Sequence, residues 1–173
     1  MTAVPVATGD LRAPALLRRM ACFLYEGVLL FGVVMAAGFV YSVATQQRHA
    51  LVGVHGMQAV LFVVLGAYFV WCWTRSGQTL AMQTWRIRLV THDGRQVRRV
   101  RALCRYVLSW LWFMPALVTV WASGLKSSAA VFTALAVGVL TYALLSRLHP
   151  QRQFLHDAVC GTRLVDWTNQ RAS

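Results

Sequence analysis

The hydrophobic positions of the chain gather into four long and nearly uninterrupted runs. They cover about residues 20–41, 51–73, 106–121 and 129–145. The first run holds 22 residues with Glu26 as its only charged residue. At ~1.5 Å per residue, a helix of this length reaches about 33 Å, enough to cross the ~30 Å hydrocarbon core of a bilayer. The pattern therefore predicts four transmembrane helices.

The third run is the shortest of the four. It has 16 residues and contains Pro115, so a helix over it reaches about 24 Å, less than the thickness of the hydrocarbon core. Proline also removes one hydrogen bond from a helix interior. We expect this span to be kinked, tilted or partly re-entrant.

The stretch between the second and third runs, residues 74–105, is polar and changes its pattern. After Gly77, which favours a helix stop, residues 85–90 alternate apolar and basic side chains with the period of a strand. Residues 91–94 (Thr-His-Asp-Gly) then supply turn chemistry. This insert is predicted to contain a strand followed by a turn.

The tail after residue 145 carries a second small pattern. Four apolar residues follow helical spacing, namely Phe154, Leu155, Ala158 and Val159. Gly161 favours a helix end, and residues 162–167 can extend as a strand. We expect an amphipathic tail that folds either against the membrane or against the strand at 85–90.

Composition supports a membrane protein and excludes several other classes. Hydrophobic residues make up 58% of the 173 residues and charged residues 13%, with a mean hydropathy of +0.54, whereas soluble domains carry roughly 25% charged residues. The low polarity excludes a disordered chain, and four cysteines without a repeat period exclude a disulfide scaffold or repeat array. We interpret residues 1–173 as one all-α membrane domain with four transmembrane helices, a small strand-turn insert and a tail.

The 17 Lys and Arg residues, against five Asp and Glu, are distributed unevenly around the spans. Three precede the first span, eight lie in the insert and four follow the fourth span, whereas the other two loops hold only Arg48 and Lys126. Because cytoplasmic loops are enriched in basic residues, both termini and the insert are predicted to be cytoplasmic. Bases that alternate with apolar runs argue against a nucleic-acid partner.

Four arginines at the approach to the third span are candidates for contact with anionic lipid. They are Arg95, Arg98, Arg99 and Arg101. A basic residue near an anionic membrane surface adds about 1 kcal/mol before screening. The alternative is that these residues only set the topology, as basic residues beside most spans do.

Glu26 is the strongest candidate for function. It follows Arg19 by seven residues, which places it about 10 Å farther along the helix axis, where an isolated carboxylate costs ~2.5 kcal/mol or more. We therefore expect a cationic partner, either Arg19 on the same helical face or Arg105 from the third span. With Asp157 on the same side of the membrane, these residues would form a cluster that either holds the bundle together or binds and releases a proton or cation.

Four short motifs occur in order around the spans. They are residues 18–26 (Arg-Arg-Met-Ala-Cys-Phe-Leu-Tyr-Glu), 77–80 (Gly-Gln-Thr-Leu), 88–94 with Arg-Leu-Val and Asp-Gly, and 156–162 with His-Asp and Gly-Thr. In these motifs the chain resembles the RDD family of bacterial membrane proteins, named for an arginine and two aspartates. By position, the family's arginine corresponds to Arg19, and its two aspartates correspond to Glu26 and Asp157. The family's frequent arginine before the third span corresponds to Arg105.

Two departures from the family pattern are visible. Glu26 keeps a carboxylate but adds one methylene, and Ala81-Met82 stand where many members have Gly-Lys, so a role that needs that lysine is not expected here. The resemblance implies a multi-pass protein of the bacterial inner membrane. It implies either cation/proton transport, because a few members have been linked to sodium/proton exchange, or a non-enzymatic accessory part of a membrane complex.

The remaining chemistry of the sequence is sparse. Four cysteines, Cys22, Cys72, Cys104 and Cys160, contain no Cys-x-x-Cys pair, so we expect packing cysteines and no metal or cofactor. Ser, His and Asp residues are scattered without a nucleophile elbow or a phosphate-binding glycine loop, so we expect no enzyme activity. Four helices are few to enclose an ion pathway. If the protein is a transporter, we therefore expect a homo-oligomer or a membrane-protein partner.

Overall fold

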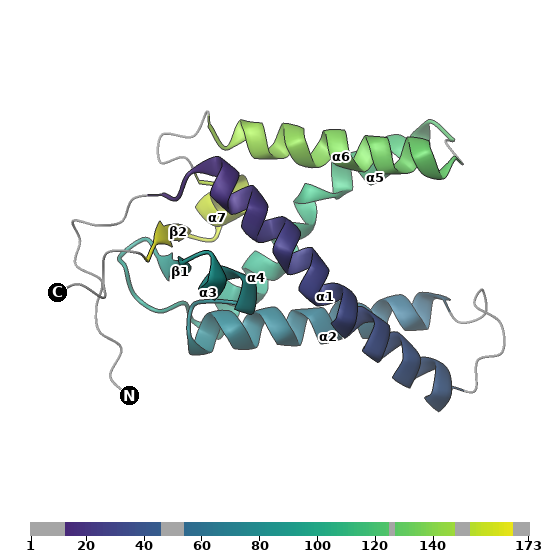
Figure 1. Cartoon of the computed structure of the whole chain (residues 1–173), viewed down its shortest axis with the longest axis horizontal. Coiled ribbons are helices and arrows are strands. Elements are labelled where there is room, and N and C mark those ends of the chain that lie inside the picture. Colours follow the sequence, from purple (N-terminus) through teal and green to yellow (C-terminus); the bar gives the residue numbers. More distant parts are fainter. Residues whose placement is uncertain (1–12, 46–53, 125–126, 148–152, 168–173) are drawn as a thin grey trace.

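The structure is a computed structural model that describes residues 13–45, 54–124, 127–147 and 153–167. Three of its helices are long and apolar enough to cross a membrane (Figure 1). They are α1 (Leu16–Ala44), α2 (Val54–Arg75) and α6 (Ser128–Leu145). A bent pair of helices is a fourth candidate. The protein therefore has three to four candidate spans, at the positions of the four predicted runs.

The bent pair corresponds to the predicted third span. Its parts are α4 (Arg99–Ser109), the 3-10 turn η1 (Trp110–Trp112) and α5 (Met114–Ala122). The two halves meet at 41°, and Pro115 lies in the first turn of α5, where its missing N–H costs no helical hydrogen bond. A bend is present at this span, in agreement with the expectation of a kinked or partly re-entrant segment. The helix begins before residue 106 because α4 is amphipathic, with Ala102 buried and Arg101 exposed.

Four short elements gather at one end of the long helices, and we call them the cap (Figure 1). They are α3 (Leu80–Thr84), β1 (Ile87–Thr91), α7 (Leu155–Val159) and β2 (Thr162–Asp166). β1 and β2 pair antiparallel, with Leu89 opposite Leu164. The tail therefore folds against the strand of the insert, which is one of the two arrangements expected. The side chains of Ile87, Leu89 and Val165 are almost completely buried in the cap.

Two details of the cap differ from the sequence prediction. The sequence pattern does not predict α3, which begins after Thr79, whose Oγ1 accepts a hydrogen bond from the Met82 amide at 3.3 Å. The strand starts at Ile87 instead of 85, because Arg86 has a φ of +52° and leaves the extended conformation. The predicted helix stop at Gly77 is confirmed, since this residue turns the chain after α2 with a φ of +72°.

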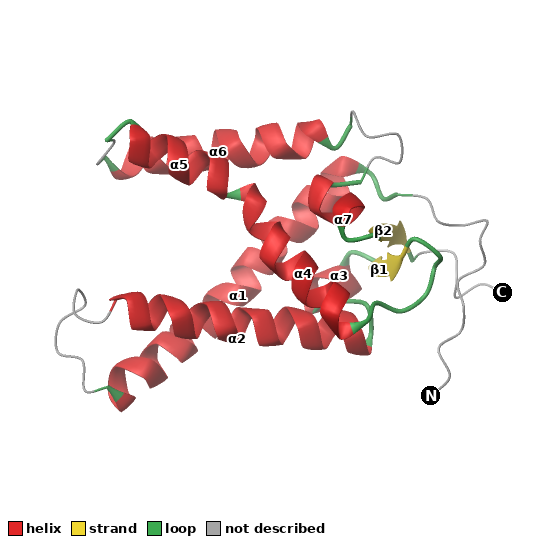
Figure 2. Ribbon diagram, turned by 180° about the vertical axis from the view of Figure 1, so that it is seen from behind, coloured by secondary structure: helices red, strands yellow, loops and turns green. Residues whose placement is uncertain are grey.

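The long helices form two pairs that the bent span connects. α1 packs against α2 and α5 packs against α6, while α4 packs against α2. Both views show α2 on one side of the molecule and α5 and α6 on the other, with α1 running obliquely from the α6 side at the cap end to α2 at its far end (Figures 1 and 2). The cap and α4 lie between the two sides at one end. At Gly138 of α6 an added Cβ would lie 2.8 Å from the Cβ of Ala116, so the absence of a side chain permits this close approach.

Candidate functional site

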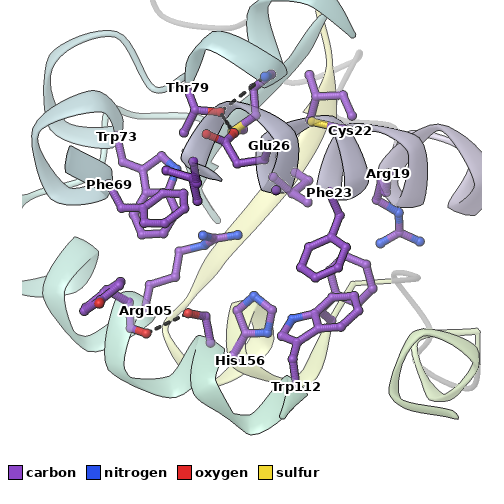
Figure 3. Close-up of a pocket in the computed structure, with 18 of the residues that line it drawn as sticks. Arg19, Cys22, Phe23, Glu26, Phe69, Trp73, Thr79, Arg105, Trp112 and His156 are labelled. Carbon is purple, nitrogen blue, oxygen red and sulfur yellow. Dashed lines mark hydrogen bonds between the residues drawn. The ribbon is translucent and has the colours of Figure 1, made fainter. Parts of the chain in front are cut away.

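A cavity of about 370 Å³ lies between α1, α2, α4 and the cap (Figure 3). Its wall is mostly apolar and includes aromatic rings from α1, α2 and the bend of the third span. The charged and imidazole side chains in the wall are Arg19, Glu26, Arg105 and His156. Three of the four residues of the predicted cluster therefore line one cavity, and Asp157 lies directly behind it, next to His156 and Arg105.

Glu26 is held by hydroxyl groups. α1 carries it into the cavity wall with 8% of its surface exposed. The Tyr68 hydroxyl of α2 donates to Oε1 at 2.9 Å, and the Thr79 hydroxyl donates to Oε2. Thr79 also accepts the first hydrogen bond of α3, so a single side chain caps this helix and holds the carboxylate.

The expected ion pair between Glu26 and an arginine is absent from the described part of the chain. Arg105 instead pairs with Asp157, with 2.6 Å between Nε and Oδ1. Arg19 lies on α1 together with Glu26, but its guanidinium stacks on the Phe154 ring, 4.5 Å from the ring centre. The crossing of α1 over α2 and α3 places two hydroxyls nearer to Glu26 than either guanidinium, which explains the difference.

The Arg105–Asp157 pair joins α4 to α7 inside the cap. The side chains of Arg105 and Asp157 are 8% and 0% exposed, and Thr162 donates a further hydrogen bond to Oδ1 at 3.2 Å. Burial alone would raise the pKa of Asp157, but the adjacent Arg105 guanidinium and the hydrogen bonds lower the pKa below its ordinary value. The carboxylate therefore stays ionised. The Arg105 guanidinium also lies over the Trp73 ring at 4.2 Å.

His156 connects this ion pair to α6. Its amide donates to the Tyr142 hydroxyl at 3.1 Å, and its Nδ1 lies 3.0 Å from the same oxygen. Because that oxygen already accepts from the amide, its own hydrogen is available to Nδ1, which leaves the proton of a neutral ring on Nε2, 3.6 Å from Asp157 Oδ1. Burial lowers the pKa of His156 to about 4, so the ring is neutral at physiological pH.

Arg19 is the least satisfied charge at the site. It is 5% exposed, and its Nε and Nη1 atoms are buried without a hydrogen-bond partner among the described residues. The neighbouring Arg18 behaves differently, because two of its nitrogens each lie 2.8 Å from the carboxylate of Asp166. Arg18 therefore ties α1 to β2, while Arg19 lines the cavity.

The four predicted surface arginines lie apart from this site. Arg95, Arg98, Arg99 and Arg101 are exposed, around the start of α4. Sequence reasoning missed Tyr68, Thr79 and Tyr142 as partners of the buried charges. Thr79 had a usable signal, since a threonine just before a short apolar helix is an N-cap pattern, whereas the two tyrosines lie inside apolar runs without one.

The fold and the site together define a multi-pass helical membrane protein with a small cap and buried charges at the junction between cap and helices. The chain belongs to the RDD family, because the family model matches residues 13–161. No curated protein and no solved structure matches the chain.

Proposed function

We propose that the protein moves a proton or a small cation across the bacterial inner membrane, alone or as a transporter subunit, and that Glu26 is the binding group. The observation that carries this proposal is the environment of Glu26. Its carboxylate is buried in an apolar helix beside a cavity, and its hydrogen bonds come from hydroxyl groups. Ionisable residues inside a span often mark ion or proton paths.

The absence of an arginine from the Glu26 contacts supports a binding role over a structural one. Neutralising one partner of a buried ion pair leaves the other charge uncompensated, which is strongly destabilising. Among the described residues, the partners of Glu26 are the uncharged hydroxyls of Tyr68 and Thr79. Protonation of Glu26 therefore leaves no cation behind. Carboxylate and hydroxyl oxygens are also the ligand type that hard cations prefer.

The second candidate function is a non-enzymatic accessory or assembly module of a membrane complex. The arrangement of the long helices favours it. α1 packs with α2 and α5 packs with α6, and the two pairs are connected through the bent span. Four spans in this arrangement are too few to enclose an ion pathway, so transport requires a second copy of the chain or a membrane-protein partner. An accessory role requires a membrane-protein partner by definition.

Ion flux into liposomes tests the two candidates against each other. We expect purified wild-type protein to carry pH-driven cation flux above that of empty liposomes. Glu26→Gln keeps the side-chain shape and removes the titrating charge, so it should abolish flux while the protein still folds. Tyr68→Phe, which removes one hydroxyl donor, is a matched variant that should change the ion dependence and retain flux. Absence of flux with the wild-type protein would contradict transport by this chain alone and would favour the accessory role.

The orientation proposed here places the cap and both termini in the cytoplasm. Reporter tags at residue 173 and within 91–96 should then report the cytoplasm, and tags near His49 or Lys126 should report the outside. Residues 49, 126 and 173 lie outside the described residues. A C-terminus on the outside would contradict a membrane crossing by the bent span.

A further inference from the structure

We propose that the cavity, which Arg19 and Arg105 both line, is a binding site for one anionic phospholipid, with the lipid phosphate at Arg19 and part of an acyl chain along α1. This inference goes beyond ion movement at Glu26, since lipid binding is measured without flux. Two observations support it: buried guanidinium groups with unused donors and an apolar wall that leads away from them.

The unused donors belong to two arginines in the cavity wall. Arg19 is 5% exposed, and two of its three guanidinium nitrogens are buried without a hydrogen-bond partner among the described residues. Arg105 uses Nε for Asp157, and no described residue accepts a hydrogen bond from its two terminal nitrogens. Figure 3 shows the Arg105 side chain extending into the middle of the cavity. Guanidinium groups bind phosphate through paired hydrogen bonds.

Asp157 pairs with Arg105 through Oδ1, and Arg19 forms no ion pair with a described residue, although the Asp157 charge acts on it from beyond ion-pair distance. A buried, uncompensated cation is costly, and an anion is the group that would relieve it. Glu26 does not serve as that anion, because its carboxylate is turned to the Tyr68 and Thr79 hydroxyls. The anion that would relieve this charge is therefore not found among the described residues, and in our proposal a lipid phosphate supplies it.

The direction of the cavity matches the direction of a membrane lipid. Arg19 lies in the first turns of α1, beside the cap, and Leu30 lies 11 residues farther along the same helix, a rise of about 16 Å. Between these levels the wall carries apolar side chains, including Phe23, Leu65 and Phe113. A phospholipid lies in a bilayer in the same way, with its phosphate at the interface and its chains pointing into the core.

Two residues that line the cavity are exposed on the apolar part of α1, and we take the entrance of the cavity to lie there. Leu24 and Gly27 line the cavity, and both are exposed on α1 within its apolar stretch. Leu24 exposes 66% of its surface. A lipid can therefore enter sideways from the membrane without first crossing water.

Gly27 allows this entrance to be blocked without disturbing the fold. A Cβ at Gly27 would meet no atom within 4 Å, and the same holds for Gly32, five residues farther along α1 and outside the cavity wall. Gly27→Leu should fill the entrance, and Gly32→Leu is the matched control on the same helix.

Native mass spectrometry of the full-length protein in detergent, titrated with defined lipids, tests the inference. The probes are dioleoylphosphatidylglycerol, dioleoylphosphatidylcholine with the same chains, oleate, and glycerol phosphate. We expect one phosphatidylglycerol per chain, bound about tenfold more tightly than phosphatidylcholine. Both lipids carry the phosphate, but the choline group of phosphatidylcholine adds a positive charge beside the arginines and cancels the net charge of the headgroup. Arg19→Gln and Gly27→Leu should each weaken it by about the same factor, while Gly32→Leu and Glu26→Gln should not.

Several outcomes would overturn the inference. Equal affinity for the two phospholipids would contradict a site for anionic lipid. Equal phosphatidylglycerol affinity of Gly27→Leu and Gly32→Leu would contradict the proposed entrance at Gly27. Tighter binding of oleate or glycerol phosphate than of phosphatidylglycerol would assign the arginines to a free fatty acid or a free phosphate instead. The two proposals can fail separately, because flux tests ion movement at Glu26 and lipid affinity tests the cavity. Loss of flux in Glu26→Gln with retained phosphatidylglycerol binding would support both.

Discussion

Glu26 and Asp157 are both buried carboxylates near the junction of the cap and the long helices, but their surroundings differ. Asp157 is completely buried and pairs with Arg105, with Thr162 as a further donor to the same oxygen. Glu26 has both oxygens bonded to uncharged hydroxyls and faces a cavity. A carboxylate paired with a buried cation must stay ionised to keep the fold, whereas one held by hydroxyls can change its protonation at lower cost.

The largest expected effect is that of Asp157→Asn. It leaves the buried Arg105 without its counter-charge, so the free energy of unfolding should fall by about 3 to 5 kcal/mol. Thermal unfolding in detergent measures this loss. The double variant with Arg105→Gln should recover part of the stability, because it removes the uncompensated charge. If the free energy of unfolding falls no more in Asp157→Asn than in Glu26→Gln, the proposed difference between the two carboxylates is wrong.

A second effect comes from His156 and depends on pH. Burial lowers the pKa of His156 to about 4, below the ordinary value of about 6.5. Between these pH values the unfolded chain binds a proton that the folded chain does not, so stability rises with pH in this window and falls on acidification. The loss should approach about 3 kcal/mol by pH 4.

Thermal unfolding midpoints measured from pH 7 to pH 4 check this dependence. His156→Asn keeps an amide group beside the Tyr142 hydroxyl and cannot titrate, so its midpoint should vary less over the same range. The contribution of Asp157 has the same sign but appears at lower pH, because its pKa is lowered from an acidic value. An equally steep slope in the variant would show that other groups cause the acid loss.

Glu26→Gln should have a smaller effect on stability. The amide keeps one acceptor oxygen for the two hydroxyl donors of Tyr68 and Thr79, so about one hydrogen bond, or ~1 kcal/mol, is lost. The same thermal unfolding assay measures it beside Asp157→Asn. A loss near that of Asp157→Asn would mean that Glu26 also acts as a structural charge.

The smallest effect per residue in physiological salt is expected at the exposed arginines, because solvent and salt screen their charges. Replacing Arg95, Arg98 and Arg99 with Gln should reduce the enrichment of phosphatidylglycerol around the protein in mixed nanodiscs, by about 1 kcal/mol per residue before screening. High salt should remove this difference, since exposed charges are screened. Lipid held in the cavity should resist the same salt. If phosphatidylglycerol enrichment is unchanged in the variant while its membrane orientation is altered, these arginines set the topology and do not bind anionic lipid.

The comparison of the two carboxylates also shows how far sequence reasoning reaches. The depth of Glu26 in an apolar run, the bend near Pro115 and the strand after Gly77 all follow from local patterns, and the structure has each of them. The amphipathic start of α4 was missed because its charged residues interrupt the apolar run that defines a span.

Local patterns along the chain determined which segments are helical and apolar, where the basic residues lie and which face of α1 carries both Arg19 and Glu26. They did not determine which groups meet. Glu26 and Thr79 are 53 residues apart, and Arg105 and Asp157 are 52 residues apart. Helical periodicity orients side chains within one element, but the choice among partners depends on how distant elements cross. Only the packing of α1 on α2 and α3, and of α4 on α7, decided that Arg105 neutralises Asp157 while hydroxyl groups hold Glu26.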